Sequence, residues 1–280
     1  MKILGVSRSN IFSPNSEARD AAIFNKVAAL LHQCGHSITI CSEDVCPSTT
    51  DARLVFSMAR SQKALQTLSQ WEQEGVVVIN SACAILRNDR LFLAKLFAEN
   101  RVGAPAFKKV NLSDLSAPFP GQAFWVKRAD ACAQEKSDVV YCPDEATWIQ
   151  ARTRFLSRGI SQLIAVEHLQ GDLIKFYGVI DQPFFYYYYP TATRTFSKFG
   201  LEEVNGAPQY LTFSPDVLHE LANRTSHLTG FSVYGGDAVV CTDGSIKIID
   251  FNDWPSFSAC LEDASKAIFS HLIKELNKNI

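Results

Sequence analysis

Short apolar runs alternate with amphipathic stretches along the first part of the chain. Four of these runs have the length of strands: 3–7, 37–41, 54–58 and 76–79. Two stretches between them have helical spacing: 16–34 and 62–73. The first stretch carries a stripe of apolar residues: Ala22, Ile23, Val27, Leu30 and Leu31. Strands that alternate with helices favour a parallel sheet covered on both faces, so an α/β lobe is predicted here.

The rest of the chain mixes the two periodicities. Further helices are predicted at 88–100, 144–157, 214–228 and 260–276. Further strands are predicted at 124–127, 162–167, 173–180, 184–189, 232–241 and 246–251. Ser214 followed by Pro215 is typical of a helix start, and the sequence at 242–244, Thr-Asp-Gly, is typical of a hairpin turn. The fold class predicted for the whole chain is therefore α/β.

Composition narrows the range of partners. The 280 residues are 47% hydrophobic and 20% charged, an ordinary globular balance, and the net charge of -2 offers no basic field for a nucleic acid. No apolar run approaches the ~18 residues that a membrane span needs. The 8 cysteines contain no Cys-x-x-Cys pair, so neither a zinc ribbon nor a thioredoxin-like motif is indicated. We expect a cytoplasmic protein with reduced thiols, whose partner is neither a nucleic acid nor a membrane.

Three oxygen-bearing side chains stand out on the predicted hairpin. Asp237 lies on its first strand, and Asp250 and Asn252 lie on the second. Side chains alternate along a strand, so Asp250 and Asn252 face the same side. Two carboxylates and an amide oxygen suit Mg²⁺, which prefers oxygen ligands. A hairpin with polar residues facing water is the alternative, but the isoleucines at 246–249 indicate a central strand, where unpaired charge is costly.

The same segment resembles a known family. Asp237, followed by Asp-Phe-Asn-Asp-Trp-Pro-Ser-Phe at 250–257, is similar to the metal-binding end of ATP-grasp enzymes. It looks most like the inositol-polyphosphate kinases of that superfamily, and it is also similar to the ribosomal-protein glutamate ligases. The ligases more often have Glu at the position of Asp250, which favours a kinase. The resemblance implies ATP and Mg²⁺ as cofactors.

The resemblance also implies an ATP-grasp fold with three lobes. A Rossmann-like lobe is expected at 1–84, a central lobe at 85–168 and a C-terminal lobe with the metal site at 169–280. Arg90 stands where the family usually has a lysine at the start of a helix, and Lys127 resembles the family's strand lysine that reaches the α-phosphate. Charge-assisted bonds from such cations to phosphate are strong. Without this context, Lys127 reads as a solvated lysine at a strand end.

Residues 164–172 are similar to the family's hinge between two lobes. The resemblance implies that Glu167 and Leu169 contact the nucleotide, with Asp172 as a further acidic candidate. Lys175 matches the cation that follows this hinge and faces the phosphates. Lys175 and Asp250 are the residues expected to be catalytic. Many family members have a glycine-rich loop over the phosphates, whereas 128–138 contain no glycine.

Three cations are candidates for binding a small anionic acceptor. Arg8 follows the first strand, at the edge where a parallel sheet presents ligands. Arg194 and Lys198 lie in a stretch rich in hydroxyls and positive charge. An ordinary solvent-exposed loop explains these residues equally well.

Three functions fit these residues. The leading hypothesis is a kinase that transfers the γ-phosphoryl group of ATP to a hydroxyl of a small anionic polyol, such as an inositol phosphate. The alternative is a ligase that uses the same ATP site to make an acyl phosphate, which an amine then attacks. A non-catalytic nucleotide-binding protein is the third, favoured by the missing glycine loop. Both reactions begin with phosphoryl transfer, so the ATP site alone does not separate them.

Overall fold

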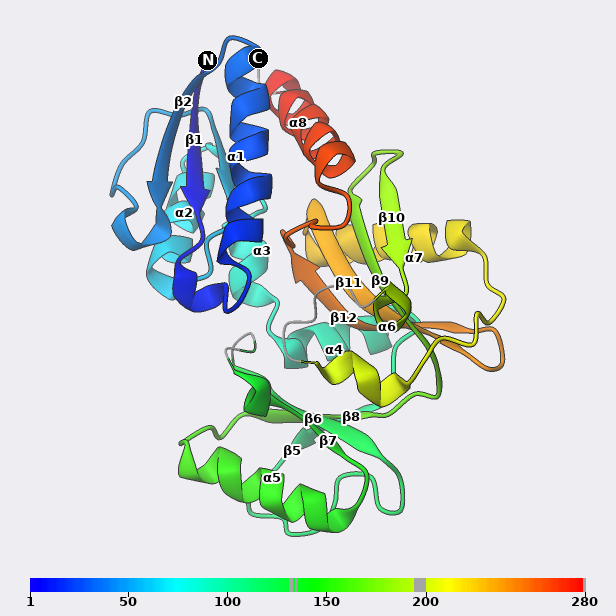
Figure 1. Ribbon diagram of the computed structural model, residues 1–280. Helices are drawn as coiled ribbons and strands as arrows, with labels where there is room; N and C mark the ends of the chain where they lie inside the picture. The colour runs from blue at the N-terminus through cyan, green and yellow to red at the C-terminus, as the bar shows by residue number, and fades with distance from the viewer. Residues whose placement is uncertain (131–132, 134, 194–199, 279–280) are drawn as a thin grey trace.

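Three four-stranded sheets divide the computed structural model into three lobes (Figure 1). The structure describes residues 1–130, 133, 135–193 and 200–278. Strands and helices are mixed in every lobe, which confirms the predicted α/β fold class. Within the described part of the chain, no helix combines the length and the apolar character needed to cross a membrane.

The N-terminal lobe is a parallel sheet with helices on both faces. Its strands, in the order β2-β1-β3-β4, are β1 (Lys2–Ser7), β2 (Ser37–Ser42), β3 (Leu54–Ser57) and β4 (Val77–Ile79). Helix α1 (Glu17–Gln33) buries Ile23, Val27 and Leu31 against one face. Helix α2 (Gln62–Gln73) buries Leu68 and Trp71 against the other. The strand arrows of this sheet point towards the other two lobes (Figure 1), so the carboxyl ends of the strands face them, as a ligand-binding α/β sheet requires.

The central lobe is an antiparallel sheet covered by one helix. Its strands, in the order β5-β8-β6-β7, are β5 (Phe107–Val110), β6 (Phe124–Arg128), β7 (Val139–Cys142) and β8 (Leu163–Glu167). Helix α5 (Glu145–Ser157) packs Trp148, Ala151 and Phe155 on one face. The opposite face of the sheet, which carries Trp125 and Lys127, faces the C-terminal lobe.

Two short helices precede this sheet, where the sequence predicted a single one. They are α3 (Ala82–Arg87) and α4 (Arg90–Glu99). The Asp89 carboxylate accepts the backbone N–H of Phe92 at 2.7 Å and so caps α4, which fixes its start at Arg90. Strands β5 and β7 were not predicted, because each has only four residues and no clear alternation of buried and exposed positions.

The C-terminal lobe holds the predicted hairpin. Its sheet, in the order β10-β9-β11-β12, comprises β9 (Gly171–Val179), β10 (Phe185–Tyr188), β11 (Val233–Cys241) and β12 (Ile246–Asp253). Helix α6 (Pro190–Thr193) follows β10, and helix α7 (Pro215–Thr229) covers one face of the sheet. Ser214 caps α7 as predicted, its hydroxyl accepting the N–H of Val217.

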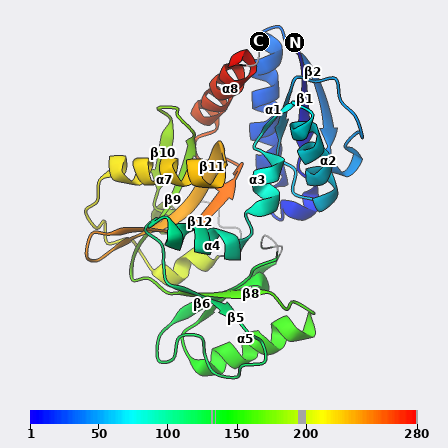
Figure 2. The ribbon, with the colours of Figure 1, turned by 180° about the vertical axis from the view of Figure 1, so that it is seen from behind.

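Several contacts join the three lobes to one another. The last helix, α8 (Leu261–Lys278), packs against α1, so the end of the predicted third lobe lies on the first lobe (Figure 2). The fully buried Asn80, after β4, donates to the Val233 carbonyl and accepts its N–H, both at 2.7 Å. Helix α4 packs on the C-terminal lobe through Leu93 and Phe97. It packs on the central sheet through Leu91 and Ala94.

Candidate functional site

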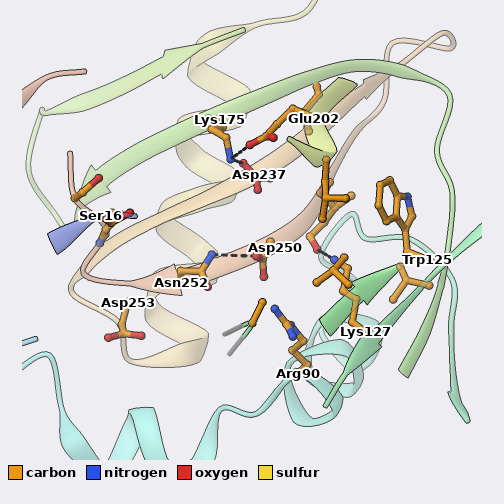
Figure 3. Close-up of a pocket in the computed structure, with 18 of the residues that line it drawn as sticks. Ser16, Arg90, Trp125, Lys127, Lys175, Glu202, Asp237, Asp250, Asn252 and Asp253 are labelled. Carbon is orange, nitrogen blue, oxygen red and sulfur yellow. Dashed lines mark hydrogen bonds and ion pairs between the residues drawn. The ribbon is translucent and has the colours of Figure 1, made fainter. Parts of the chain in front are cut away.

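A cavity of about 350 Å³ lies where the three lobes meet (Figure 3). Its lining includes Arg8 and Arg60 from the N-terminal lobe and Lys127 from the central lobe. The C-terminal lobe contributes Lys175 and Asp250, among others. The volume is in the range of a small-molecule site.

Three neighbouring strands place one row of charges on the cavity face. Asp237 on β11 is directly opposite Lys175 on β9 and Asp250 on β12. Directly opposed residues on one face of a sheet lie about 5 Å apart, so the row is compact. Gly235, two residues earlier on β11, lets Tyr177 and Pro255 pack closely on the strand, because a Cβ atom there would lie 2.8 Å from each of them.

A β-bulge on β12 gives the row its shape. Asp237 pairs with Asp250 and Ala238 pairs with Ile248, which leaves Ile249 without a cross-strand partner. Ile248 is buried against α7, whereas Ile249 and Asp250 both line the cavity. The bulge therefore turns an apolar and an acidic side chain to the same side.

Asp237, Asp250 and Asn252 form a set of oxygen donors on this face. The side-chain N–H of Asn252 donates to Asp250 at 3.1 Å, which leaves the amide oxygen of Asn252 to act as a ligand. The structure thus brings together the three residues that the sequence suggested for Mg²⁺. Two carboxylates and an amide oxygen suit this ion, which prefers oxygen ligands, and these three residues would hold it.

Two cations from the central lobe face Asp250. Lys127 donates to the backbone carbonyl of Ile249 at 3.4 Å, and Arg90 donates to the carbonyl of Arg128 at 2.9 Å. Burial acts to raise the pKa of Asp250, but Lys127, Arg90 and the bond from Asn252 outweigh it and lower the pKa. Burial also lowers the pKa of Lys127, although Asp250 opposes this shift.

Lys175 is held between two carboxylates. Its ammonium lies 2.9 Å from Asp237 and 3.3 Å from Glu202. Burial opposes the charge on Lys175, but these two anions outweigh it and raise the lysine pKa. The pKa of Asp237 is also raised, because burial and the nearby Asp250 outweigh the same lysine. The charged form is therefore favoured more strongly for Lys175 than for Asp237, because the Asp250 carboxylate lies beside Asp237.

An apolar slot adjoins the charged row. Leu169, Leu173 and Val239 form a buried cluster with Ile249 packed against it, and all four residues line the cavity. On the central lobe, the Trp125 indole donates to Nδ1 of His168 at 3.1 Å. Burial lowers the pKa of His168, so its ring is neutral at pH 7. A flat apolar base fits between such walls, next to a charged region for its phosphates.

Solved structures resemble this architecture over its full length. D-alanyl-alanine synthetase A from Vibrio cholerae has a TM-score of 0.71 at 11% identity, with 99% of this chain and 98% of that chain covered. D-alanine–D-alanine ligase from Bacillus anthracis, complexed with ATP, has a TM-score of 0.66 at 12% identity, with 100% and 97% covered. The ATP-grasp ligase PsnB, complexed with precursor peptide PsnA2 and AMPPNP, has a TM-score of 0.62 at 17% identity, with 98% of each chain covered. This chain has the ATP-grasp fold. At these identities the likeness concerns the fold alone, and no protein-family model and no curated protein matches the sequence.

Two acidic residues of the segment that was expected to form the hinge are engaged by the protein itself. Glu167 lines the cavity, but its carboxylate accepts the N–H of Ala106 at 2.9 Å and lies 3.4 Å from the Lys247 ammonium. Asp172 is 2% exposed and lies outside the cavity lining. Leu173 and Lys175 face the cavity, so strand alternation turns Asp172 to the opposite side. This placement corrects the expected nucleotide contact at Asp172.

Of the three predicted acceptor residues, the structure describes only Arg8. The Arg8 guanidinium donates at 3.0 Å to each of three groups: the Met58 carbonyl, the Asp20 carboxylate and the Trp254 carbonyl. Its side chain is only 9% exposed, and Arg8 lines the cavity while it joins the N-terminal lobe to the C-terminal lobe. Arg194 and Lys198 lie outside the described residues.

Sequence reasoning missed two parts of the site. Glu202, on the 3₁₀-helix η4 (Leu201–Asn205), belongs to no motif and enters the cavity through tertiary packing. Arg60 and Asp253 pair at 2.6 Å at the end near the N-terminal lobe. Asp253 directly follows Asn252, so only its position in the motif could have suggested it.

Proposed function

We propose that this protein is a Mg²⁺- and ATP-dependent ligase that activates a carboxylate as an acyl phosphate and joins it to an amine. One observation carries the proposal. Lys127 and Arg90 of the central lobe face the oxygen row Asp237, Asp250 and Asn252 across a cavity that also has an apolar slot. Cations on one wall, carboxylates on the other and a base-sized slot beside them are what a triphosphate with a divalent cation needs.

The residues divide the work of binding. The apolar slot at Leu169, Leu173 and Val239 takes the adenine, and Lys127 and Arg90 neutralise phosphate charge. Asp237, Asp250 and Asn252 hold Mg²⁺, which neutralises charge on the phosphate oxygens when bound. Because the lysine pKa is raised, Lys175 stays charged beside the transferring group over the whole physiological range.

The proposed reaction proceeds in two steps. A carboxylate oxygen of the first substrate attacks the γ-phosphorus of ATP, and ADP leaves. The amine nitrogen of the second substrate then attacks the acyl carbon, and inorganic phosphate leaves with the original carboxylate oxygen. The enzyme contributes positioning and charge neutralisation, because phosphoryl transfer requires little else from the protein.

The end of the cavity near the N-terminal lobe, where the acceptor is expected to bind, supports a ligase over an inositol phosphate kinase. Among the described residues there, Arg8 pairs with Asp20 and Arg60 pairs with Asp253. An inositol phosphate carries several negative charges and needs cations in excess of carboxylates. Two of the neighbouring solved structures are ligases by name, and the third is a D-alanyl-alanine synthetase. Phosphorylation of a polyol is the second candidate, and it rests on Asp250 in place of the Glu that is common in ligases.

Isotope transfer tests the proposal. The protein is incubated with Mg-ATP and panels of amines and carboxylic acids labelled with ¹⁸O in the carboxylate. A ligase forms ADP, a condensation product and phosphate that carries one ¹⁸O atom. A mass gain of one phosphate on a polyol indicates the kinase instead, and the absence of ADP with every substrate contradicts both.

A further inference from the structure

The central lobe contains a buried carboxylate that the proposed reaction does not use. It belongs to Asp138, the last residue of the 3₁₀-helix η3 (Lys136–Asp138), and its side chain is 0% exposed. Asp138 is not among the residues that line the cavity, although Val139, which follows it, is. A buried carboxylate is costly unless it is paired. The partners of Asp138 therefore indicate what this residue does.

Two arginines and a backbone N–H surround the Asp138 carboxylate. Arg158, at the end of α5, lies 2.7 Å from one of its oxygens, and Arg128, the last residue of β6, lies 3.6 Å from the other. The second oxygen also accepts the backbone N–H of Glu135 at 3.2 Å. Asp138 thus joins three parts of the central lobe: the end of β6, the turn at η3 and the end of α5.

The ion pair between Arg128 and Asp138 extends a strand ladder. The pairing of β6 with β7 runs as far as Lys127 and Val139. Arg128 and Asp138 are the next residues, so their side chains connect the two chains where backbone pairing has ended. The Arg128 guanidinium also bonds to Asp130 at 2.9 and 3.1 Å, but this contact is local to two residues of one segment. Asp138 therefore connects Arg128 to η3 and α5.

The end of β6 in turn holds a cation of the site. The Arg90 guanidinium donates to the Arg128 carbonyl at 2.9 Å and projects towards Asp250 in the cavity (Figure 3). A guanidinium carries its N–H donors in a rigid planar fork, so a bond from one nitrogen constrains the direction of the others. The position of the Arg128 carbonyl therefore helps to determine where Arg90 points.

Resting on the proposed function, we infer that Asp138 is a positioning residue for the phosphates of ATP. It holds Arg128 at the end of β6, and the Arg128 carbonyl keeps Arg90 directed at the phosphates beside Asp250. Without the negative charge of Asp138, two arginine side chains lose a counter-charge and the end of β6 loses its link to η3 and α5. Asp138 touches no substrate and acts on ATP binding through Arg90.

A double-mutant cycle tests this inference. Calorimetry measures the affinity for Mg-ATP in the wild type, Asp138→Asn, Arg90→Met and the double variant. We expect a loss of about fivefold in Asp138→Asn and about tenfold in Arg90→Met. The double variant should lose no more than Arg90→Met alone, about tenfold, because Asp138 has nothing to position once the guanidinium is gone. A purely structural role of Asp138 would instead multiply the two losses, to about fiftyfold.

A second carboxylate of the same lobe is the matched control. Asp144 caps α5, where it accepts the backbone N–H of Thr147 at 2.7 Å. Asp144→Asn is expected to keep the wild-type affinity for Mg-ATP, in the presence and in the absence of Arg90→Met. If Asp138→Asn does not fold, Arg158→Met repeats the cycle, because it removes the closest partner of Asp138 and its side chain is 29% exposed.

The outcomes separate this inference from the proposed function. Wild-type affinity in Asp138→Asn or in Arg90→Met, or losses that multiply in the double variant, overturns the positioning role and leaves the ligase proposal standing. A wild-type protein that does not bind Mg-ATP removes the proposed function and this inference together.

Discussion

The two ends of the cavity use charge in different ways. Around β12, the cations of the central lobe and the carboxylates of the C-terminal lobe come from different walls, and Lys127 bonds to a carbonyl and Asp250 to an amide. Near the N-terminal lobe, the cations are already paired with carboxylates, as in Arg60 with Asp253. Charge that is buried without a close counter-charge is costly unless a ligand completes it. Lys127 and Asp250 at the first end are therefore prepared for a charged ligand, and the Arg60–Asp253 pair at the second end joins two lobes.

The largest effect is expected at Asp250. Asp250→Asn removes one negative charge from the oxygen row while keeping the shape of the side chain. We expect ATP turnover to fall by about 1,000-fold, as when a preorganised electrostatic group is lost. ADP formation is measured for this variant and for Asp243→Asn, whose carboxylate accepts the backbone N–H and the hydroxyl of Ser245 in the hairpin turn. Near-wild-type turnover in Asp250→Asn contradicts the metal assignment.

The next effect concerns stability at the paired end. Arg60→Ala leaves Asp253, which is 2% exposed, without its counter-charge, and the other Asp253 oxygen has no hydrogen-bond partner among the described residues. Removing one partner of a buried pair costs about 3 kcal/mol of unfolding free energy. Urea unfolding measures the loss, and ATP affinity is expected to stay close to that of the wild type.

A surface pair in the same lobe provides the control for Arg60. Lys2 pairs with Asp51, and both side chains are mostly exposed. Exposed ion pairs contribute little to stability, so Lys2→Met is expected to leave the urea midpoint nearly unchanged. If Arg60→Ala is as stable as Lys2→Met but binds ATP poorly, the two ends of the cavity do not differ as described.

Lys127 should affect binding rather than folding. Lys127→Met removes a partly buried cation that faces Asp250, and with it the proposed charge-assisted bond to phosphate. We expect the affinity for Mg-ATP to fall by roughly 10- to 100-fold while the unfolding midpoint changes little. Calorimetric titration checks this, with Lys266→Met on the exposed side of α8 as the control. Unchanged affinity in Lys127→Met would show that the phosphates lie elsewhere.

The smallest effect is on pH dependence. Burial lowers the pKa of Lys127, so its neutral form appears at a lower pH than for an ordinary lysine. ATP needs the charged form, so its affinity is expected to fall several-fold as the pH rises into the alkaline range. Binding should also take up protons there, because the phosphates favour the ammonium. Titrations in buffers of different ionisation enthalpy detect this uptake, which Lys127→Arg should abolish.

The fold was predictable where one periodicity ran long enough. The helix at 62–73 and the hairpin at 232–251 follow from patterns of apolar residues and from turn and cap residues. Strands β5 and β7 are too short to show a period, and they exist because β6 and β8 pair with them. Local patterns carry no information about such partners.

The site was predictable only in its local part. Strand alternation explains why Asp237, Asp250 and Asn252 share a face. The bulge at Ile249, which turns this apolar side chain to the same face, could not be predicted from alternation. Arg8 bonds to Trp254, 246 positions away, a contact that no local pattern indicates. Glu202 enters the cavity through the packing of η4, which no motif encodes.

The central claim is that the oxygen row on β11 and β12 holds a divalent cation beside a triphosphate. Calorimetry of ATP binding with and without Mg²⁺, in the wild type and in Asp250→Asn, tests it most directly. We predict that Mg²⁺ tightens ATP binding by the wild type at least about tenfold and that this gain is absent in the variant. Equal gains in both proteins, or no effect of Mg²⁺ on the wild type, would contradict the account.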